Sequence, residues 1–339
     1  MSGLPVPQHI LSPRSVMAEI MNRSGPVQRD SAWAVPLVVV ATGLFYVVAY
    51  LFVADEFPFD VGRDIGYRLD VWLDWLKDNL GPLFQAIKDV IVWFLISLED
   101  MMLWFTWPAS IAAIALVSWL LVSTRMALFS ASSLLLLATF GLWESTVETM
   151  ALIIVTVTLS IMIAVPLGVW ASQSDRLDAV LRPMLDAMQT MPSFVYLVPA
   201  IAFFSLGNTP AVLATLIYAV PPAVRLTNLG IRQLPAETLE AADSFGMTRR
   251  QMLLKVKIPL AIPTIMAGVN QTTLMALSMV VIASLVGAGG LGLDVNRALG
   301  RIEPGNGFLA GLGIVFVAII IDRITQALTK KQQDALGSE

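Results

Sequence analysis

The sequence predicts an all-α protein that crosses a membrane several times, with about eight transmembrane helices. The chain has 339 residues, of which 57% are hydrophobic, and its mean hydropathy is +0.76. Charged residues make up only 14%, well below the roughly 25% of soluble domains. A lipid-embedded backbone must pair its polar groups internally, and no ten-residue alternating pattern indicates barrel strands, so we expect helices.

The composition also excludes several classes of site. The chain has no cysteine, which excludes disulfides, thiolate catalysis and cysteine-bound metals. Its one histidine, His9, lies in a polar N-terminal tail and supports neither a catalytic triad nor a zinc site. The net charge of −4 gives no indication of nucleic acid. No secretory signal is evident, because the first apolar stretch begins only near Ala32.

Eight apolar segments are candidate spans, since a crossing needs about 20 mostly apolar residues, or fewer for a helix buried among others. In chain order they are Ala32–Ala54, Ala109–Ser123, Met126–Leu142, Thr146–Ser172, Leu185–Leu206, Ala211–Val224, Pro263–Gly287 and Phe308–Leu328.

The distribution of lysine and arginine predicts the orientation. If the polar segment around Glu240 is cytoplasmic, 15 of the 21 basic residues face the cytoplasm. The exceptions are Arg63, Arg68, Lys77, Lys88, Arg297 and Arg301. Both ends, residues 1–31 and 329–339, are then cytoplasmic tails, and residues 109–328 form the transmembrane core. A hidden span within residues 55–108 would invert everything that precedes it.

Residues 55–108 are predicted to be amphipathic and to lie on the outer membrane surface. Between Leu83 and Phe105 apolar residues recur at helical spacing, but four charged residues interrupt them and leave an apolar core too short to cross. Five of the nine tryptophans lie here, and indole rings favour the headgroup level. They are Trp72, Trp75, Trp93, Trp104 and Trp107. The alternative is an aromatic cage for a ligand cation.

A polar, basic segment interrupts the apolar core at residues 232–260. Pro235 suits the first turn of a helix, and Glu237 and Glu240 complement its positive N-terminal end. Gly246 supplies a stop or a tight turn before a second amphipathic helix. We therefore expect a helix–glycine–helix element on the cytoplasmic face. An ordinary amphipathic loop near headgroups is the alternative.

The sequence Glu240–Ala241–Ala242, with Gly246 four residues on and Ile258–Pro259–Leu260 at the end, resembles the cytoplasmic EAA loop of ABC importer permeases. The usual ending, isoleucine-x-leucine-proline, is shifted here. Four further blocks resemble the glycine betaine/proline-type permeases of this binding-protein-dependent family, with coverage from about Gly141 to Leu328. They are MQTMPSFVY at 188–196, PPAVRL at 221–226, AGVNQ at 267–271 and SLVGAGGLG at 284–292.

This resemblance implies the fold of a type I ABC importer permease with a cytoplasmic coupling helix. Such a permease is not itself an enzyme and binds no cofactor, because two cytoplasmic ATPase subunits hold the ATP and Mg²⁺. The chain has no G-x-x-x-x-G-K-[ST] phosphate loop. An external, periplasmic binding protein delivers the substrate. The residues implied to couple to the ATPase are Glu240, Ala241, Ala242, Ser244, Phe245, Gly246 and Arg249.

Polar and aromatic residues within the spans are candidates for the translocation path, because polar groups at this depth should face the bundle interior or a cavity. Hydrogen bonding between helices is an equal alternative. The candidates are Gln189, Phe194, Tyr196, Asn270, Gln271, Thr273 and Ser278. Phe203 and Phe204 are further rings that a cationic substrate could use.

Gly287, Gly289 and Gly290 are expected to form a flexible turn or gate near the outer mouth. The segment 287–292 formally matches G-x-G-x-x-G, but it closes a transmembrane helix instead of following a strand, which argues against a dinucleotide site. Glu144 and Glu148, one turn apart, either decorate a helix N-terminus or form an anionic vestibule. Pairing with Arg297 or Arg301 would support the first reading.

Together these features predict an inner-membrane permease of an ATP-driven importer for a small methylated amine or betaine, a class of osmoprotectants. Glycine betaine, proline betaine, choline, carnitine and trimethylamine N-oxide are not distinguished. One permease unit per chain makes a homodimer the economical expectation. An ion-coupled secondary transporter is the main alternative, because it also uses interrupted helices. An intramembrane enzyme or a scaffold is a further alternative, although no nucleophile–base pair is evident.

Overall fold

The computed structural model describes residues 34–51 and 61–337, and within these ranges it contains helices and no strands. The predicted tail 1–31, with His9, lies outside the described residues. By internal contacts the chain divides into two units, residues 1–70 and 71–339, which are considered separately. In the first unit, α2 (Ala34–Leu51) is an apolar helix and α3 begins at Val61.

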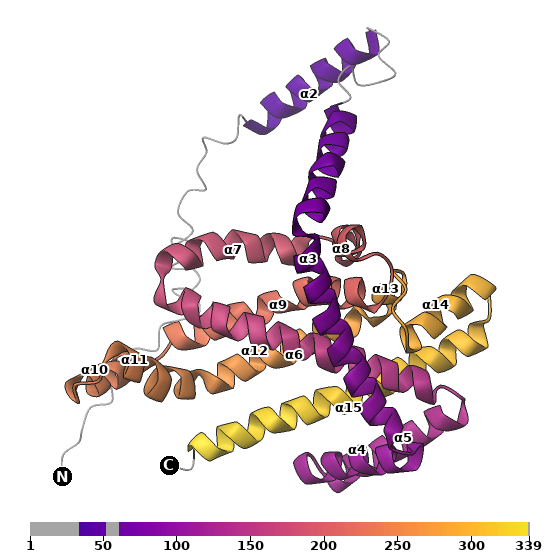
Figure 1. The fold of residues 1–339 in the computed structure, drawn as a ribbon. Coiled ribbons are helices and arrows are strands. Elements are labelled where there is room, and N and C mark those ends of the chain that lie inside the picture. The colour runs from indigo at the N-terminus through magenta and orange to yellow at the C-terminus, as the bar shows by residue number, and fades with distance from the viewer. Residues whose placement is uncertain (1–33, 52–60, 338–339) are drawn as a thin grey trace, which may run out of the picture. The chain divides into compact units, whose positions relative to one another are not determined.

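The second unit is a helical bundle formed by the rest of the chain (Figure 1). The helix α3 continues from the first unit and ends at Trp104. The elements that follow are α4 (Trp107–Leu121), α5 (Thr124–Thr139), α6 (Trp143–Gln173), α7 (Asp175–Thr190), η2 (Ser193–Tyr196), α8 (Leu197–Phe204), α9 (Asn208–Arg232), α10 (Ala236–Ser244), α11 (Arg249–Gln251), η3 (Met252–Lys257), α12 (Ile258–Ser278), α13 (Val280–Ser284), α14 (Leu291–Arg301) and α15 (Pro304–Gly337).

The prediction of eight spans is not confirmed. Among the residues that the structure describes, five helices are long and apolar enough to cross a membrane: Gly62–Trp104, Trp143–Gln173, Asn208–Arg232, Arg249–Ser278 and Pro304–Leu328. A sixth span results if the bent pair α7 and η2–α8 counts as one. The apolar helices α2, α4 and α5 are shorter. At about 1.5 Å per residue, the 15 residues of α4 extend about 23 Å, less than the roughly 30 Å hydrocarbon core.

The helix α3 differs from the expectation that its apolar core is too short to cross. It is one continuous helix of 44 residues, Val61–Trp104, and its stretch Gly62–Trp104 contains a window apolar enough to span. Lys88, Asp89, Glu99 and Asp100 all lie within this continuous helix and do not break it. The surface location of this segment therefore stays a prediction.

The helices α6, α9 and α12 form the centre of the bundle and pack side by side (Figure 1). Lipid tails are as apolar as the helices, so close backbone approach through small residues drives such packing. A Cβ on Gly168 of α6 would lie 2.6 Å from the Thr227 Cβ of α9. A Cβ on Gly268 of α12 would lie 3.0 Å from the Ala223 Cα of α9. These glycines set the distance between the three helices.

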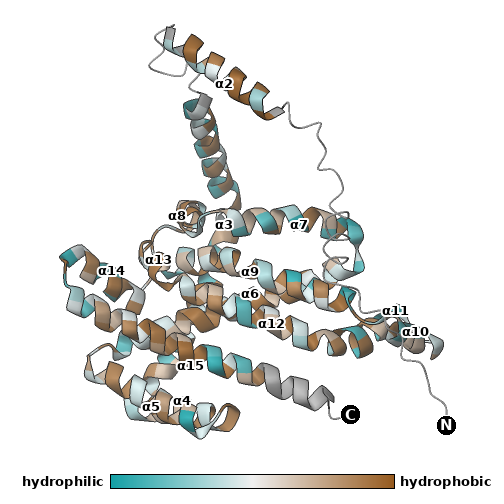
Figure 2. Ribbon diagram, turned by 180° about the vertical axis from the view of Figure 1, so that it is seen from behind, coloured by the Kyte–Doolittle hydropathy of each residue, from teal (hydrophilic) through white to brown (hydrophobic). Residues whose placement is uncertain are grey.

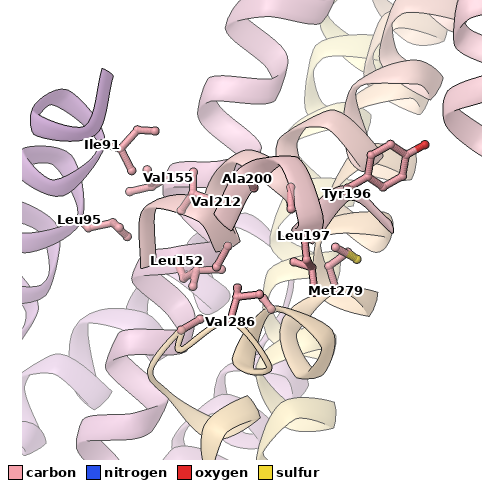
Figure 3. Packing of buried hydrophobic residues seen from close by; sticks show 14 residues of the cluster. Ile91, Leu95, Leu152, Val155, Tyr196, Leu197, Ala200, Val212, Met279 and Val286 are labelled. Carbon is pink, nitrogen blue, oxygen red and sulfur yellow. The ribbon is translucent and has the colours of Figure 1, made fainter. Parts of the chain in front are cut away.

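A cluster of buried apolar side chains joins α3 and α6 to α8, α9 and α13. Figure 3 shows Ile91 and Leu95 of α3 directed toward Val155 of α6. Val286 lies at the lower edge of the cluster in this view. Leu95 is 1% exposed although most of α3 is exposed. One stripe of α3 therefore fixes it to the bundle.

The two ends of the bundle carry different elements. The polar helices α10 and α11 lie at the end where α9 stops and α12 starts, and α13 and α14 lie at the opposite end (Figure 1). Figure 2 shows hydrophilic residues on α14 and at the start of α7, in contrast to the largely hydrophobic α4. By the predicted orientation, α10 and α11 mark the cytoplasmic end and α14 the outer end.

Candidate functional site

The polar segment between α9 and α12 has the helix–glycine–helix arrangement expected from the sequence. Pro235 is the N-terminal cap residue of α10, and Gly246 follows that helix with φ +73°. A residue with a Cβ is strained at this φ, and no atom lies within 4 Å of a Cβ placed on Gly246. The backbone turn, not a tight contact, is therefore the reason for glycine.

The helix after this glycine is fixed at its start by a capping box. The Thr248 hydroxyl accepts a hydrogen bond from the Gln251 backbone N–H at 3.3 Å, and the Gln251 side chain accepts one from the Thr248 N–H at 2.9 Å. Residues Met252–Lys257 then continue as a π-helical turn into α12. Because a π-turn has more residues per turn than an α-helix, the side chains that follow it point in directions shifted from those of a regular α-helix.

The predicted coupling residues present a mostly exposed surface. Ala242 is buried at 7% exposure in an element that contacts η3, whereas Phe245 at the tip is 85% exposed. The others, Glu240, Ala241, Ser244, Gly246 and Arg249, are exposed. An aromatic side chain held in water at a rigid turn matches the anchors found at protein interfaces.

The predicted path residues divide into two groups. Gln189, Gln271 and Ser278 are exposed, and Phe194 is 59% exposed. Tyr196 and Thr273 are buried in the protein and hydrogen bonded: the Tyr196 hydroxyl donates to the Met188 carbonyl at 2.5 Å and points away from the apolar cluster (Figure 3). The Thr273 hydroxyl donates to the Val269 carbonyl at 3.0 Å. Neither is on the surface of this conformation.

The polar residues of α12 differ in their hydrogen bonding. Thr272 donates a hydrogen bond to the Ala219 carbonyl of α9 at 2.8 Å, so it joins two helices. The Asn270 side-chain oxygen is buried and makes no hydrogen bond in the described part of the chain. A buried amide oxygen without a partner is costly, which makes Asn270 the strongest path candidate of this helix.

The glycine turn after α13 contacts the loop before α9. The Gly207 N–H donates to the Val286 carbonyl at 2.7 Å, and the Gly289 N–H donates to the Asn208 side-chain oxygen at 3.0 Å. Gly287 and Gly290 have φ of +87° and +82°. The φ of Gly289 is not positive, but a Cβ at this position would collide with the Glu148 carboxylate. The turn follows helix α13, which does not fit the dinucleotide motif.

The candidate rings Phe203 and Phe204 contact a third ring, Phe84 of α3. The Phe84 ring stacks on Phe203 at a centroid distance of 4.6 Å and meets Phe204 edge-on at 5.6 Å. These rings therefore pack against each other. The five tryptophans of the 55–108 segment are all exposed, from 49% at Trp107 to 82% at Trp104.

The acidic pair at the start of α6 is not neutralised by the outer arginines. Among the described residues no ion pair joins Glu144 or Glu148 to Arg297 or Arg301, and Arg297 lies 3.9 Å from Asp294 instead. The pairing that would have supported a purely decorative role is absent from this part of the structure. In the same ranges, no three acidic or histidine side chains are grouped for a metal ion.

Sequence reasoning missed a cluster of charged and polar side chains where α6 and α7 meet the end of α9. Its members are Asp175, Asp178, Arg182, Asn228 and Arg232. The available signal was the i,i+4 spacing of Asn228 and Arg232 at the end of α9.

Comparison with known proteins gives concordant matches. The model of the family described as "Binding-protein-dependent transport system inner membrane component" matches residues 164–334. The glycine betaine/proline betaine transport system permease protein ProW of Escherichia coli is 45% identical over 264 residues, 77% of this chain and 75% of ProW. The glycine betaine/carnitine transport permease protein GbuB of Listeria monocytogenes is 44% identical over 268 residues, 77% of this chain and 95% of GbuB.

A solved structure shares the fold. A chain of the MetNI methionine ABC transporter, in an inward-facing conformation, superposes with a TM-score of 0.51 and 22% sequence identity. The match covers 59% of this chain and 97% of that chain.

Proposed function

We propose that this chain, which belongs to the family of binding-protein-dependent transport system inner membrane components, is the membrane-spanning permease of an ATP-driven importer for a small methylated-amine osmolyte. The chain lies in the inner membrane and is a transport component. The observation that carries the proposal is the exposed element α10–Gly246–α11, placed between two spans at one end of the bundle.

The substrate class follows from the relatives. The names of the ProW and GbuB permeases both include glycine betaine, together with proline betaine or carnitine. All three carry a methylated quaternary nitrogen and a carboxylate. We infer that this chain passes the same chemical class, with selection left mainly to the binding protein.

The partners are proposed from the same family membership. Two cytoplasmic ATPase subunits would bind ATP and Mg²⁺, and a periplasmic binding protein would deliver substrate. The bundle would be completed by a second copy of this chain. Nucleotide-driven closure of the ATPases would move α10, with the exposed Phe245 and the small residue Ala241 against the ATPase surface and Ala242 packed behind them. Nucleotide state and bundle state then bias one another.

The path and the gate are assigned on the geometry described above. Gln189, Phe194, Gln271 and Ser278 would face the path directly, and Asn270 would reach it with a small rotation of α12. Tyr196 and Thr273 would lie behind the residues that face the path and hold the backbone of their helices in place through their hydrogen bonds. The turn Gly287–Gly290 would open by releasing its hydrogen bonds to Gly207 and Asn208.

Reconstitution in liposomes tests this proposal against a secondary transporter. The chain is purified with its ATPase and binding protein, and uptake of labelled glycine betaine, choline and trimethylamine N-oxide is measured. We expect uptake only with ATP inside the liposomes and binding protein outside. Uptake by the chain alone under a sodium or proton gradient would overturn the proposal in favour of ion coupling.

A further inference from the structure

Arg232, the last residue of α9, holds three helices together at the predicted cytoplasmic end of the bundle. Its Nη1 donates a hydrogen bond to the Asp175 carboxylate of α7 at 2.6 Å, and its Nη2 donates to the Ala171 carbonyl near the end of α6 at 2.9 Å. Its Nε donates to the Asn228 side-chain oxygen within α9 at 2.9 Å. Every nitrogen of the guanidinium is used, which fixes its orientation.

A buried carboxylate lies at the centre of the same cluster. Asp178 of α7 is 6% exposed, and its carboxylate accepts hydrogen bonds from Asn228 at 2.7 Å and from Arg182 at 2.6 Å. The Nη2 of Arg232 lies 4.0 Å away. Asn228 therefore bridges the buried carboxylate and the arginine, and a change at one is felt by the other.

A second contact ties α7 to α9 two turns further along. Arg225 of α9 donates to the Asp186 carboxylate of α7 at 2.5 Å. The two side chains are 39% and 65% exposed. In the Arg232 cluster the Arg232 side chain is 30% exposed and Asp178 is 9% exposed, whereas Asp175 is 92% exposed. An exposed pair is weakened by water and salt far more than a partly buried one. The firmer part of the Arg232 cluster is therefore its bond to the Ala171 carbonyl and the bonds around the buried Asp178, while the bond to Asp175 is open to water on the carboxylate side.

The cluster lies between the two moving parts of the proposed transporter. Only Gln233, Leu234 and Pro235 separate Arg232 from α10. On the other side, α7 leads to the bend of 109° between α7 and η2–α8. The Tyr196–Met188 hydrogen bond spans that bend. A displacement of α10 thus has a short, hydrogen-bonded route to the bend.

We propose that Arg232, held by Asp175 and Asn228, is a positioning residue that passes the movement of α10 to α7 and so to the broken helix that carries Phe194. The inference rests on the proposed function, because it assigns a transmission role within it. If α7, α9 and α10 move as one rigid body, no such transmission is needed, and Arg232 then only stabilises the fold.

The substitution Arg232→Gln tests this in the reconstituted complex with ATPase and binding protein. It removes the charge and the cross-helix bond to Asp175. Arg182→Gln is the matched control, because Arg182 bonds the same buried carboxylate from within α7 and is 69% exposed. Three quantities are measured for each: glycine betaine imported per ATP hydrolysed, stimulation of ATP hydrolysis by the liganded binding protein, and the unfolding temperature.

We expect Arg232→Gln to lower import per ATP by about fivefold or more, the range of typical coupling effects, with continued basal ATP hydrolysis. Arg232→Lys should restore part of the lost import per ATP, because lysine keeps the positive charge but lacks the planar guanidinium that donates several hydrogen bonds at once. Arg182→Gln should stay within about twofold of wild type, because it crosses no helix boundary. Asn228→Leu, which removes the bridge, should resemble Arg232→Gln.

Import per ATP equal to wild type in Arg232→Gln, or a fall in Arg182→Gln of the same size, would overturn the inference. A lower unfolding temperature of Arg232→Gln with unchanged import per ATP would also overturn the inference, because it would show that Arg232 only stabilises the fold. Failure of the wild-type complex to import with ATP is a different result, because it contradicts the proposed function itself.

Discussion

The hydroxyl of Thr149, on α6, accepts a hydrogen bond from the backbone N–H of Leu291 at 2.8 Å, across 142 residues of sequence. Leu291 begins α14 directly after the glycine turn and is fully buried. The Thr149 hydroxyl itself donates to the Ser145 carbonyl at 2.7 Å. One side chain thus satisfies a helix N-terminus and anchors the proposed outer gate to the central helix α6.

Replacing Thr149 with valine should loosen this anchor. Valine keeps the shape and leaves the buried Leu291 N–H without a partner, which costs about 1–3 kcal/mol. Thr149→Ser keeps the hydroxyl and is the control. Thermal unfolding in detergent measures the difference. Equal unfolding temperatures for the valine and serine variants would show that the bond contributes nothing.

Gly168→Ala should destabilise the bundle through steric overlap. The added Cβ would lie 2.6 Å from the Thr227 Cβ and 2.7 Å from the Val224 carbonyl oxygen. Both belong to α9, so the helices must separate, at a cost of about 1–3 kcal/mol for overpacking.

Gly311→Ala is the matched control for this overlap. Gly311 lies within α15 and has no atom within 4 Å of the added Cβ. Alanine there should be neutral or stabilising by up to about 1 kcal/mol, because it favours the helix. If Gly168→Ala unfolds at the same temperature as Gly311→Ala, close packing at Gly168 is not required.

The overall class and the helices α6 and α15 could be predicted from the sequence, because each is a long apolar run between polar segments. For α9 only the apolar part Ala211–Val224 was predicted, and the helix continues to Arg232. The helix–glycine–helix element was also predictable, since Pro235 and Gly246 carry their backbone preferences locally. Hydropathy alone could not show that Leu185–Leu206 breaks at Met191 and Pro192, or that α3 is one continuous helix.

The candidate site was less accessible from sequence. The role of Arg232 depends on Asp175, which is 57 residues away in the chain, and that partnership is set by the return of α7 along α9. Likewise, nothing local distinguishes Gln271, which is exposed, from Thr273, which is buried. The helical period gives the angle between two side chains around the helix axis, but which of them is buried depends on where the neighbouring helices lie.

The positive φ of Gly246 predicts a graded effect on coupling. Gly246→Ala should strain the turn by about 1–2 kcal/mol and displace Phe245, whereas Gly246→Asn should be tolerated because asparagine adopts this conformation more readily. In the reconstituted complex, alanine should lower import per ATP, and asparagine should lower it less. Full coupling in the alanine variant would mean that the turn is not needed.

The location of α3 can be tested with single cysteines, because the chain contains none. Arg68→Cys and Asp100→Cys place exposed thiols near the two ends of α3, 32 residues or about 48 Å apart in a helix. A helix on the outer surface should react with a membrane-impermeant maleimide from outside at both positions. Reaction from opposite sides would show that α3 crosses the membrane.

The central claim is that the turn between α10 and α11 docks on a separate ATPase. The most direct measurement is cross-linking from Phe245→Cys, whose side chain position is 85% exposed in the isolated chain. In inverted membrane vesicles, with the cytoplasmic face outward, we predict a cross-link to the nucleotide-binding subunit that changes in yield with ATP. A residue 245 that is labelled only from the periplasmic face, or that cross-links to no nucleotide-binding subunit, would contradict the account.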